Sequence, residues 1–249
     1  MTLSPDLEGT KTAPINIQQP SYSTYMPTQT TLPLTTVTFP EISLRTRDGH
    51  KLRGYFGELF REHSPILHNH YEDGSLRYGY PLVQYKVLHN LPTLVGLRDG
   101  ASLLAQLFLQ IRELDLDGDK IPVLSKHIRH EQAAIGLSED LHKYKFETLW
   151  MALNQENFRD YRNNTEAGQQ AQLKRVLISQ LLAVFKDVGL WLGPDDRIML
   201  HLDVSERATQ FKNQTMLAFS GTFTSNIILP DGLGLGKQVA RGFGSVKRI

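Results

Sequence analysis

The chain has 249 residues, of which 40% are hydrophobic, and this is enough apolar material for one large domain or two smaller ones. It contains no cysteine, which excludes disulfides and thiolate metal sites, and its formal net charge of +1 argues against a protein that coats nucleic acid non-specifically. No long apolar run and no basic start followed by an apolar stretch is present, so we expect no membrane span, no signal peptide and a cytoplasmic location.

Residues 1–33 form the least patterned part of the sequence. They are rich in Pro, Ser and Thr, and neither helical nor alternating apolar spacing develops there. We therefore expect a flexible tail, with ordered structure beginning at Leu34.

Residues 34–138 contain a regular succession of expected elements. Thr, Val, Phe and Ile predict a strand over 35–45, and helical spacing of apolar residues predicts a helix after Asp48. A hairpin of strands 80–87 and 93–97 follows, then a second helix that begins at Asp99, and then a last strand at 121–128. The order β-α-β-β-α-β is that of a ferredoxin-like domain.

Residues 139–249 repeat part of this plan. A strand at 144–153 leads through a polar loop around Asn163 into a long amphipathic helix at 170–191, and strands follow at 197–204, 215–224, 227–229 and 243–249. No second long helix is expected in this half. The fold class is therefore α+β, with two tandem ferredoxin-like (RAMP/RRM-like) domains and a glycine-rich loop near the C-terminus.

That loop is the most informative stretch of the sequence. Two Gly-apolar-Gly pairs flank a five-residue segment that carries Lys237 and Arg241, and Lys247 and Arg248 follow; the four glycines are Gly234, Gly236, Gly242 and Gly244. Glycine allows positive φ and close approach of a ligand to the backbone, and successive N–H groups with nearby cations form an anion site. The pattern favours binding of a phosphate backbone, although a glycine-rich turn between two strands without a ligand has the same composition.

With this loop placed before the last strand of a second ferredoxin-like domain, the chain resembles the RAMP-superfamily endoribonucleases that process CRISPR repeat RNA. The Gly-h-Gly-x5-Gly-h-Gly pattern carries most of the resemblance, and three shorter matches support it: Leu52-Arg53-Gly54, Leu67-His68 and Tyr80-Pro81-Leu82. The resemblance implies RNA cleavage without metal or other cofactor, by the 2′-hydroxyl beside the scissile phosphate, with a cyclic phosphate product. CRISPR repeat RNA, the guide RNA and subunits of a CRISPR effector complex are the partners that it implies.

Histidine suits the acid and base roles of such a cleavage because its pKa lies near neutrality. His68 and His70 stand in an expected loop after the first helix, where the family often has its catalytic histidine, and His68 matches the Leu-His position. The alternatives are a hydrogen-bonded loop pair, or a His-x-His metal site that has no clear third ligand in the sequence.

Three residues of the first expected helix complete the candidates. Tyr55 could transfer a proton, while Lys51 and Arg53 could neutralise the scissile phosphate. A core aromatic and two solvated charges would have the same pattern. We expect a metal-independent endoribonuclease, and the alternative is a non-catalytic RNA-binding subunit of a CRISPR effector complex.

Overall fold

The structure is a computed structural model, and it describes residues 28–59, 79–211 and 214–249. Its first half contains β1 (Gln29–Thr38), α1 (Gly49–Leu59), β2 (Val83–Leu88), β3 (Leu91–Leu97), α2 (Asp99–Leu107), β4 (Glu113–Leu116) and β5 (Asp119–Pro122), with short 3-10 turns η1 (Thr46–Asp48) and η3 (Phe108–Gln110). Its second half contains β6 (His127–Phe146), α3 (Gln155–Asn163), α4 (Glu166–Asp187), β7 (Leu200–Phe211), β8 (Gln214–Ile228), the 3-10 turn η4 (Val239–Arg241) and β9 (Val246–Arg248).

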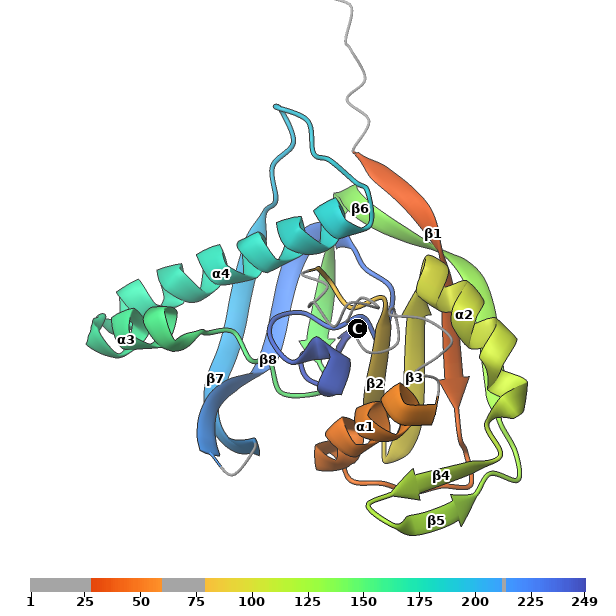
Figure 1. Ribbon diagram of the computed structural model, residues 1–249. Coiled ribbons are helices and arrows are strands. Elements are labelled where there is room, and N and C mark those ends of the chain that lie inside the picture. The colour runs from red at the N-terminus through yellow and green to blue at the C-terminus, as the bar shows by residue number, and fades with distance from the viewer. Residues whose placement is uncertain (1–27, 60–78, 212–213) are drawn as a thin grey trace, which may run out of the picture.

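The first ferredoxin-like unit is built on β2, β3, β1 and β6, which lie in that order in the sheet and pair antiparallel. Its two helices lie over the same strands: α1 contacts β2, while α2 contacts β1 and β3 (Figure 1). The hairpin of β2 and β3 turns at His89 and Asn90, both of which have positive φ. The order β-α-β-β-α-β is the one that the sequence predicts, but a β4–β5 hairpin that was not expected precedes the last strand, which begins at His127 and not at residue 121.

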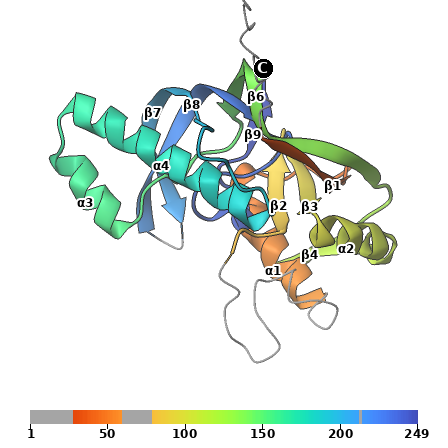
Figure 2. The same cartoon turned by 90° about the horizontal axis from the view of Figure 1, so that it is seen from above.

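The second unit is built on β9, β6, β8 and β7 in the same way, with α4 packed against β7. A three-residue turn, η4, stands where a second helix would complete the ferredoxin-like plan. The α+β class, the tandem arrangement and the missing second helix are thus confirmed. Figure 2 shows α3 and the first part of α4 on the side of the molecule away from α2, while the C-terminal end of α4 reaches the first unit, where Arg98 Nη1 donates to Asp187 O at 3.1 Å.

Strand β6 belongs to both units, because its first part pairs with β1 and its second part with β8 and β9. The two parts meet at Gly136, whose φ is +142° and where a Cβ would lie 2.5 Å from the backbone of Gln29. The pairing register then shifts between Leu137 and His142. The sequence predicts separate strands at 121–128 and 144–153 because exposed charged residues interrupt the apolar pattern of β6, and the boundary expected near residue 138 falls inside this strand.

The described residues form two hydrophobic cores. One lies beneath α1 and α2 around Phe39, Phe56 and Tyr85, and the other lies beneath α4 around Trp150 and Phe219. The second core also includes Leu32, Leu34, Val95 and Leu97 of the first unit. The two units are therefore joined by packed side chains as well as by β6, which limits their relative movement.

Two further elements differ from the sequence expectation. β1 begins at Gln29 and not near residue 35; its residues 29–33 pair with β6 alone, so Pro33 needs no N–H for a second neighbour. α3 replaces the expected polar loop, because Asn154 accepts a hydrogen bond from Asn157 N–H at 2.7 Å and caps a helix of almost entirely polar residues. Among the described residues, no helix is long and apolar enough to cross a membrane.

Candidate functional site

The glycine-rich loop, here residues 233–245, closes on itself. Leu235 N–H donates to Gly244 O at 2.9 Å, Val246 N–H donates to Leu233 O at 2.9 Å, and Gly234 forms an isolated antiparallel bridge with Ser245. The two arms therefore run side by side, and the tip carries Lys237, η4 and Arg241.

Two of the loop glycines are required by the protein's own atoms. Gly244 has φ of +68°, and a Cβ there would lie 1.9 Å from Leu235 O. Gly236 has φ of +95°, and a Cβ there would lie 2.7 Å from Met151 O and 2.9 Å from the Trp150 ring. From the sequence, we expected a ligand to lie close to these glycines, whereas atoms of the chain itself occupy the space where a Cβ would stand.

The other two glycines are less uniform. A Cβ at Gly234 would lie 2.4 Å from the Val239 side chain, and one at Gly242, with φ of +93°, would lie 3.2 Å from Tyr85 O. A role of the four glycines in RNA binding stays a prediction. Their immediate effect is to fix the shape of the tip, and the described residues offer no acceptor to the N–H groups of Gln238, Val239 and Ala240.

A buried lysine that the sequence analysis missed anchors the loop from below. Lys86 of β2 is fully buried and its ammonium donates to Ser245 Oγ at 2.7 Å, while Gln84 Oε1 accepts from Gly234 N–H at 3.1 Å. Burial lowers the pKa of Lys86 to about 7, and the negative charge of Glu147 partly opposes this shift. In the sequence, alternating polar residues on a strand indicate a solvated face, so the burial of Lys86 could not be foreseen.

The loop meets α1 at its other side. A Cβ on Gly49 would lie 2.9 Å from Arg241 O, and α1 contacts η4. Arg53 of α1 is close enough to influence Arg241, because burial and then the charge of Arg53 lower the pKa of the Arg241 guanidinium. The structure therefore brings together two cations that lie 188 residues apart (241 minus 53) in the sequence. Two guanidinium groups within electrostatic range of each other attract phosphate oxygens, and Arg241 Nη1 also donates a hydrogen bond to Gln238 Oε1.

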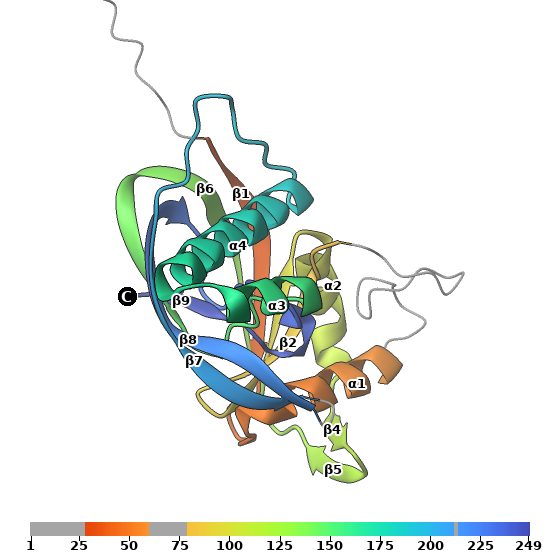
Figure 3. The same ribbon diagram turned by 90° about the vertical axis from the view of Figure 1, so that its left-hand side faces the viewer.

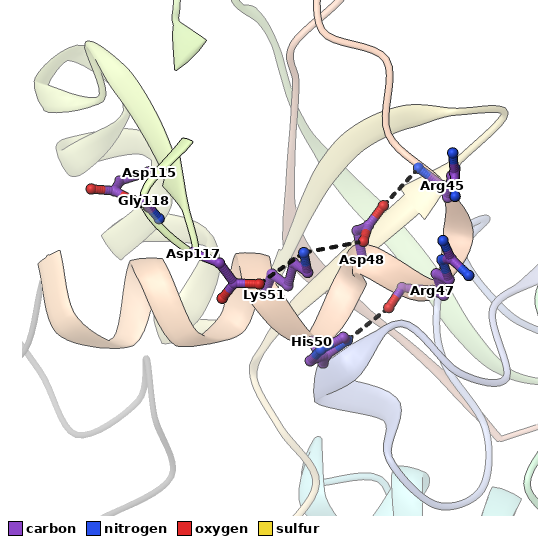
Figure 4. A network of polar contacts seen from close by, with 8 residues as sticks. All are labelled: Arg45, Arg47, Asp48, His50, Lys51, Asp115, Asp117 and Gly118. Atoms are coloured by element: carbon purple, nitrogen blue, oxygen red, sulfur yellow. Dashed lines mark hydrogen bonds and ion pairs between the residues drawn. The ribbon is translucent and has the colours of Figure 1, made fainter. Parts of the chain in front are cut away.

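His50 stands at the start of α1, directly after Gly49, where an added Cβ would lie 2.9 Å from Arg241 O. Its Nδ1 lies 2.7 Å from Arg47 O, and Figure 4 shows it on the side of α1 next to the C-terminal loop. A carbonyl oxygen only accepts, so Nδ1 donates and, in the neutral ring, Nε2 is left as an unprotonated acceptor. The sequence analysis did not select His50 as a catalytic candidate.

Lys51 and Tyr55 point the other way along α1. Lys51 Nζ lies 2.8 Å from Asp117 Oδ2 and 3.8 Å from Asp48 Oδ1, and Figure 4 shows it directed toward the β4–β5 turn. Tyr55 donates its hydroxyl to Glu113 O at 2.7 Å, and burial raises its pKa. Both side chains hold the β4–β5 hairpin against α1, so we leave them out of the proposed chemistry.

Lys247 and Arg248 lie on a third surface. They belong to β9, which pairs with β6, and they line a groove of about 700 Å³ that also contains His127 and Arg129. Acidic side chains share this groove, and Arg129 forms an ion pair with Glu131 at 2.6 Å. These two cations are therefore separated from the pair formed by Arg53 and Arg241.

Lys237 lies on the flank of the loop that faces α3 and α4. Its N–H donates to Met151 O at 2.9 Å, and it lines a polar cavity between the loop and these helices. The cationic residues predicted from the loop sequence are thus divided among three surfaces.

His68 and His70 lie outside the described residues, so their catalytic role stays a prediction. The described part of the chain contains no group of three or more His, Asp or Glu residues that could hold a metal ion.

Two family models match the chain in sequence. The Cas6b N-terminal domain matches residues 30–134 and the Cas6b C-terminal domain matches residues 136–249. An uncharacterised protein of Methanocaldococcus jannaschii is 30% identical over 146 residues, which is 59% of this chain and 99% of that protein.

Solved structures agree with these matches. A crystal structure of Cas6b is similar with a TM-score of 0.83 at 32% identity, and one described as the CRISPR RNA processing endoribonuclease Cas6b has a TM-score of 0.72 at 29% identity. Each alignment covers 88% of this chain and all of the other. Csf5, described as a type IV Cas6 crRNA endonuclease, shares the fold with a TM-score of 0.57 at 11% identity, over 88% of this chain and 100% of its own.

Proposed function

The chain belongs to the Cas6b family, and on this premise we propose that it is an endoribonuclease that cuts CRISPR precursor RNA within the repeats. The observation that supports this most directly is the junction of α1 with the glycine-rich loop. There the charge of Arg53 acts on Arg241, His50 lies on the side of α1 next to the loop, and the described residues offer no acceptor to three backbone N–H groups of the loop tip. Phosphate-binding groups beside a proton-transfer group are what RNA cleavage requires.

The reaction that we propose needs no metal. The 2′-hydroxyl attacks the adjacent phosphorus as it loses its proton, the P–O5′ bond breaks, and the leaving 5′-oxygen takes up a proton. The products are a 2′,3′-cyclic phosphate and a 5′-hydroxyl. Negative charge grows on the non-bridging oxygens as the bonds change, so the guanidinium groups of Arg53 and Arg241 stabilise the transition state.

His68 and His70 are our first choices for the proton transfers, with His68 preferred, and His50 is the candidate that the described residues add. His50 could act as a base through Nε2 because its Nδ1 is occupied by Arg47 O. A general acid or base contributes a factor of about 10² to 10⁴ in rate. Replacement of a catalytic histidine by Ala is therefore expected to slow cleavage by this factor, whereas replacement of a histidine that takes no part in proton transfer is not.

The test is single-turnover cleavage of a synthetic repeat RNA in EDTA. We expect a 2′,3′-cyclic phosphate end, and no cleavage of an RNA with a 2′-deoxy substitution at the cut site. Arg53→Ala and Arg241→Ala should both slow the reaction, whereas Lys120→Ala, an exposed cation on β5 at the Lys51 side of α1, should not.

Two results would contradict the proposal. Cleavage that disappears in EDTA and returns with a divalent metal would refute the metal-independent reaction. Tight binding of several repeat RNAs with no cleavage would favour the alternative, a non-catalytic RNA-binding subunit of an effector complex.

A further inference from the structure

The polar cavity that Lys237 lines lies on the flank of the glycine-rich loop that faces away from α1. It has a volume of about 720 Å³ and is bounded by α3, α4 and the loop residues Gly236 and Lys237. Figure 3 shows α3 beside α4 on this side of the molecule. The volume is within the range of sites that hold one small organic ligand or one nucleotide.

The wall formed by α4 is polar although the helix is amphipathic. Leu173, Leu177 and Leu181 face the core, while a neighbouring stripe of the same helix lines the cavity: Gln172, Arg175, Val176, Ser179 and Gln180. These positions recur at intervals of three and four residues, so they lie on one helix face.

Two glutamines hold this wall in place. Gln172 Nε2 donates to Asn157 O at 2.8 Å, and its Oε1 accepts from Asn164 Nδ2 at 3.2 Å. Gln180 Nε2 donates to Ala152 O at 3.0 Å, and its Oε1 accepts from Trp150 Nε1 at 2.8 Å. Both amides are engaged through their nitrogen and their oxygen, so the cavity is preformed and rigid.

Other polar groups in the cavity have no such engagement. Within the part of the chain that the structure describes, the side chains of Asn157, Arg175 and Lys237 contact no hydrogen-bond or ion-pair partner. Asp160 is the acidic residue of the lining, so two cations face one carboxylate. An amide and two cations that line one cavity and that no described residue engages suit a ligand that has both a heterocyclic edge and a phosphate.

We propose that this cavity holds one unpaired nucleotide of the bound RNA, with Asn157 at the edge of the base and with Arg175 and Lys237 at the flanking phosphates. The inference rests on the proposed function, because it takes the ligand of the glycine-rich loop to be RNA. Carboxamides present a donor and an acceptor side by side, which is how Asn and Gln recognise bases. Sequence-specific RNA recognition acts mainly on unpaired bases of this kind.

The experiment measures binding of the full-length protein to a single-stranded repeat RNA in which each base is removed in turn. For the wild type, we expect one position at which loss of the base weakens binding about 5- to 150-fold, the range for one amide–base pair. In Asn157→Ala, that cost should fall to less than twofold while the other positions keep theirs. Asn157→Ala retains the backbone N–H that donates to the capping side chain of Asn154. The control is Gln155→Ala, which removes an exposed amide of the same helix outside the cavity.

A base scan of Asn157→Ala that superimposes on the wild-type scan would overturn the proposal. So would a free mononucleotide that binds in an Asn157-dependent manner while RNA binding does not depend on Asn157, because the cavity would then serve a soluble nucleotide. Cleavage by the wild type is measured in parallel. If the wild type cleaves RNA and the base scan of Asn157→Ala equals that of the wild type, only the proposal for the cavity is refuted. If the base scan depends on Asn157 but the wild type does not cleave, the endonuclease proposal is refuted and the proposal for the cavity is supported.

Discussion

Lys86 makes the stability of the protein depend on pH in a way that can be calculated. Its ammonium is fully buried between β2 and the glycine-rich loop, and burial lowers its pKa from 10.5 to about 7. Between these two pH values the unfolded chain carries a proton that the folded chain lacks. Stability therefore rises as pH increases through this window, and the cost of burying the charge is greatest below pH 7.

We expect Lys86→Met to remove this dependence. Each unit of pKa difference corresponds to about 1.4 kcal/mol, so from about pH 7.5 to about pH 9.5 the free energy of unfolding of the wild type should rise by about 2.5 kcal/mol relative to that of the variant. The variant also leaves Ser245 Oγ without its donor, at a cost of about 1 kcal/mol that does not vary with pH. The pH-dependent part is thus separate from the lost hydrogen bond.

Urea unfolding at several pH values gives both free energies, and their difference removes the titrations that the two proteins share. Lys145→Met, which replaces an exposed lysine of β6, is the control and should give a flat difference. A flat difference for Lys86→Met as well would show that the ammonium is not held in a desolvated site.

Three further predictions concern the loop and the helix beside it. Gly244→Ala should lower the free energy of unfolding by about 2 to 5 kcal/mol, because a Cβ there would lie 1.9 Å from Leu235 O at positive φ. Gly232→Ala, also at positive φ but with its nearest contact at 3.6 Å, should lower it by only about 1 to 2 kcal/mol. Equal losses for the two variants in urea unfolding would refute this reasoning. Arg53→Ala and Arg241→Ala should each reduce the slope of log affinity against log salt by about 0.7 for single-stranded RNA, and unchanged slopes in binding titrations would remove both residues from the phosphate contacts. Asn154→Ala should destabilise the fold by about 1 kcal/mol through loss of the α3 cap, measured by urea unfolding, and a loss near zero would mean that α3 does not depend on this hydrogen bond.

The tandem fold was predictable from the sequence because its strands and longer helices have clear apolar periodicity. The hairpin of β2 and β3, α2 and α4 were all expected from that periodicity. α3 was not, because its polar residues face the cavity and solvent and its one strong indication is the capping residue Asn154. The continuity of β6 was missed because a strand shared by two units has different buried faces along its length.

The candidate site was predictable in composition but not in arrangement. Residue types identify the basic loop, yet which cations converge depends on contacts between distant segments. Arg53 and Arg241 come together because α1 and η4 meet, whereas Lys51, only two residues from Arg53, is held by Asp117 of the β4–β5 turn. His50 was passed over because an exposed position at a helix start gives no indication of the loop that lies beside it.

The structure of the loop tip also constrains the path of the RNA under the two proposals. The backbone N–H of Lys237 donates to Met151 O and this residue borders the α3–α4 cavity, while the backbone of Arg241, the last residue of η4, lies against Gly49 of α1. An RNA strand that contacts both cations must therefore cross η4, where the N–H groups of the tip are unengaged by the described residues. It follows that the nucleotide held in the cavity and the phosphate that is cut belong to different nucleotides. Under the two proposals, recognition of a base and cleavage of the backbone are performed on opposite flanks of the loop.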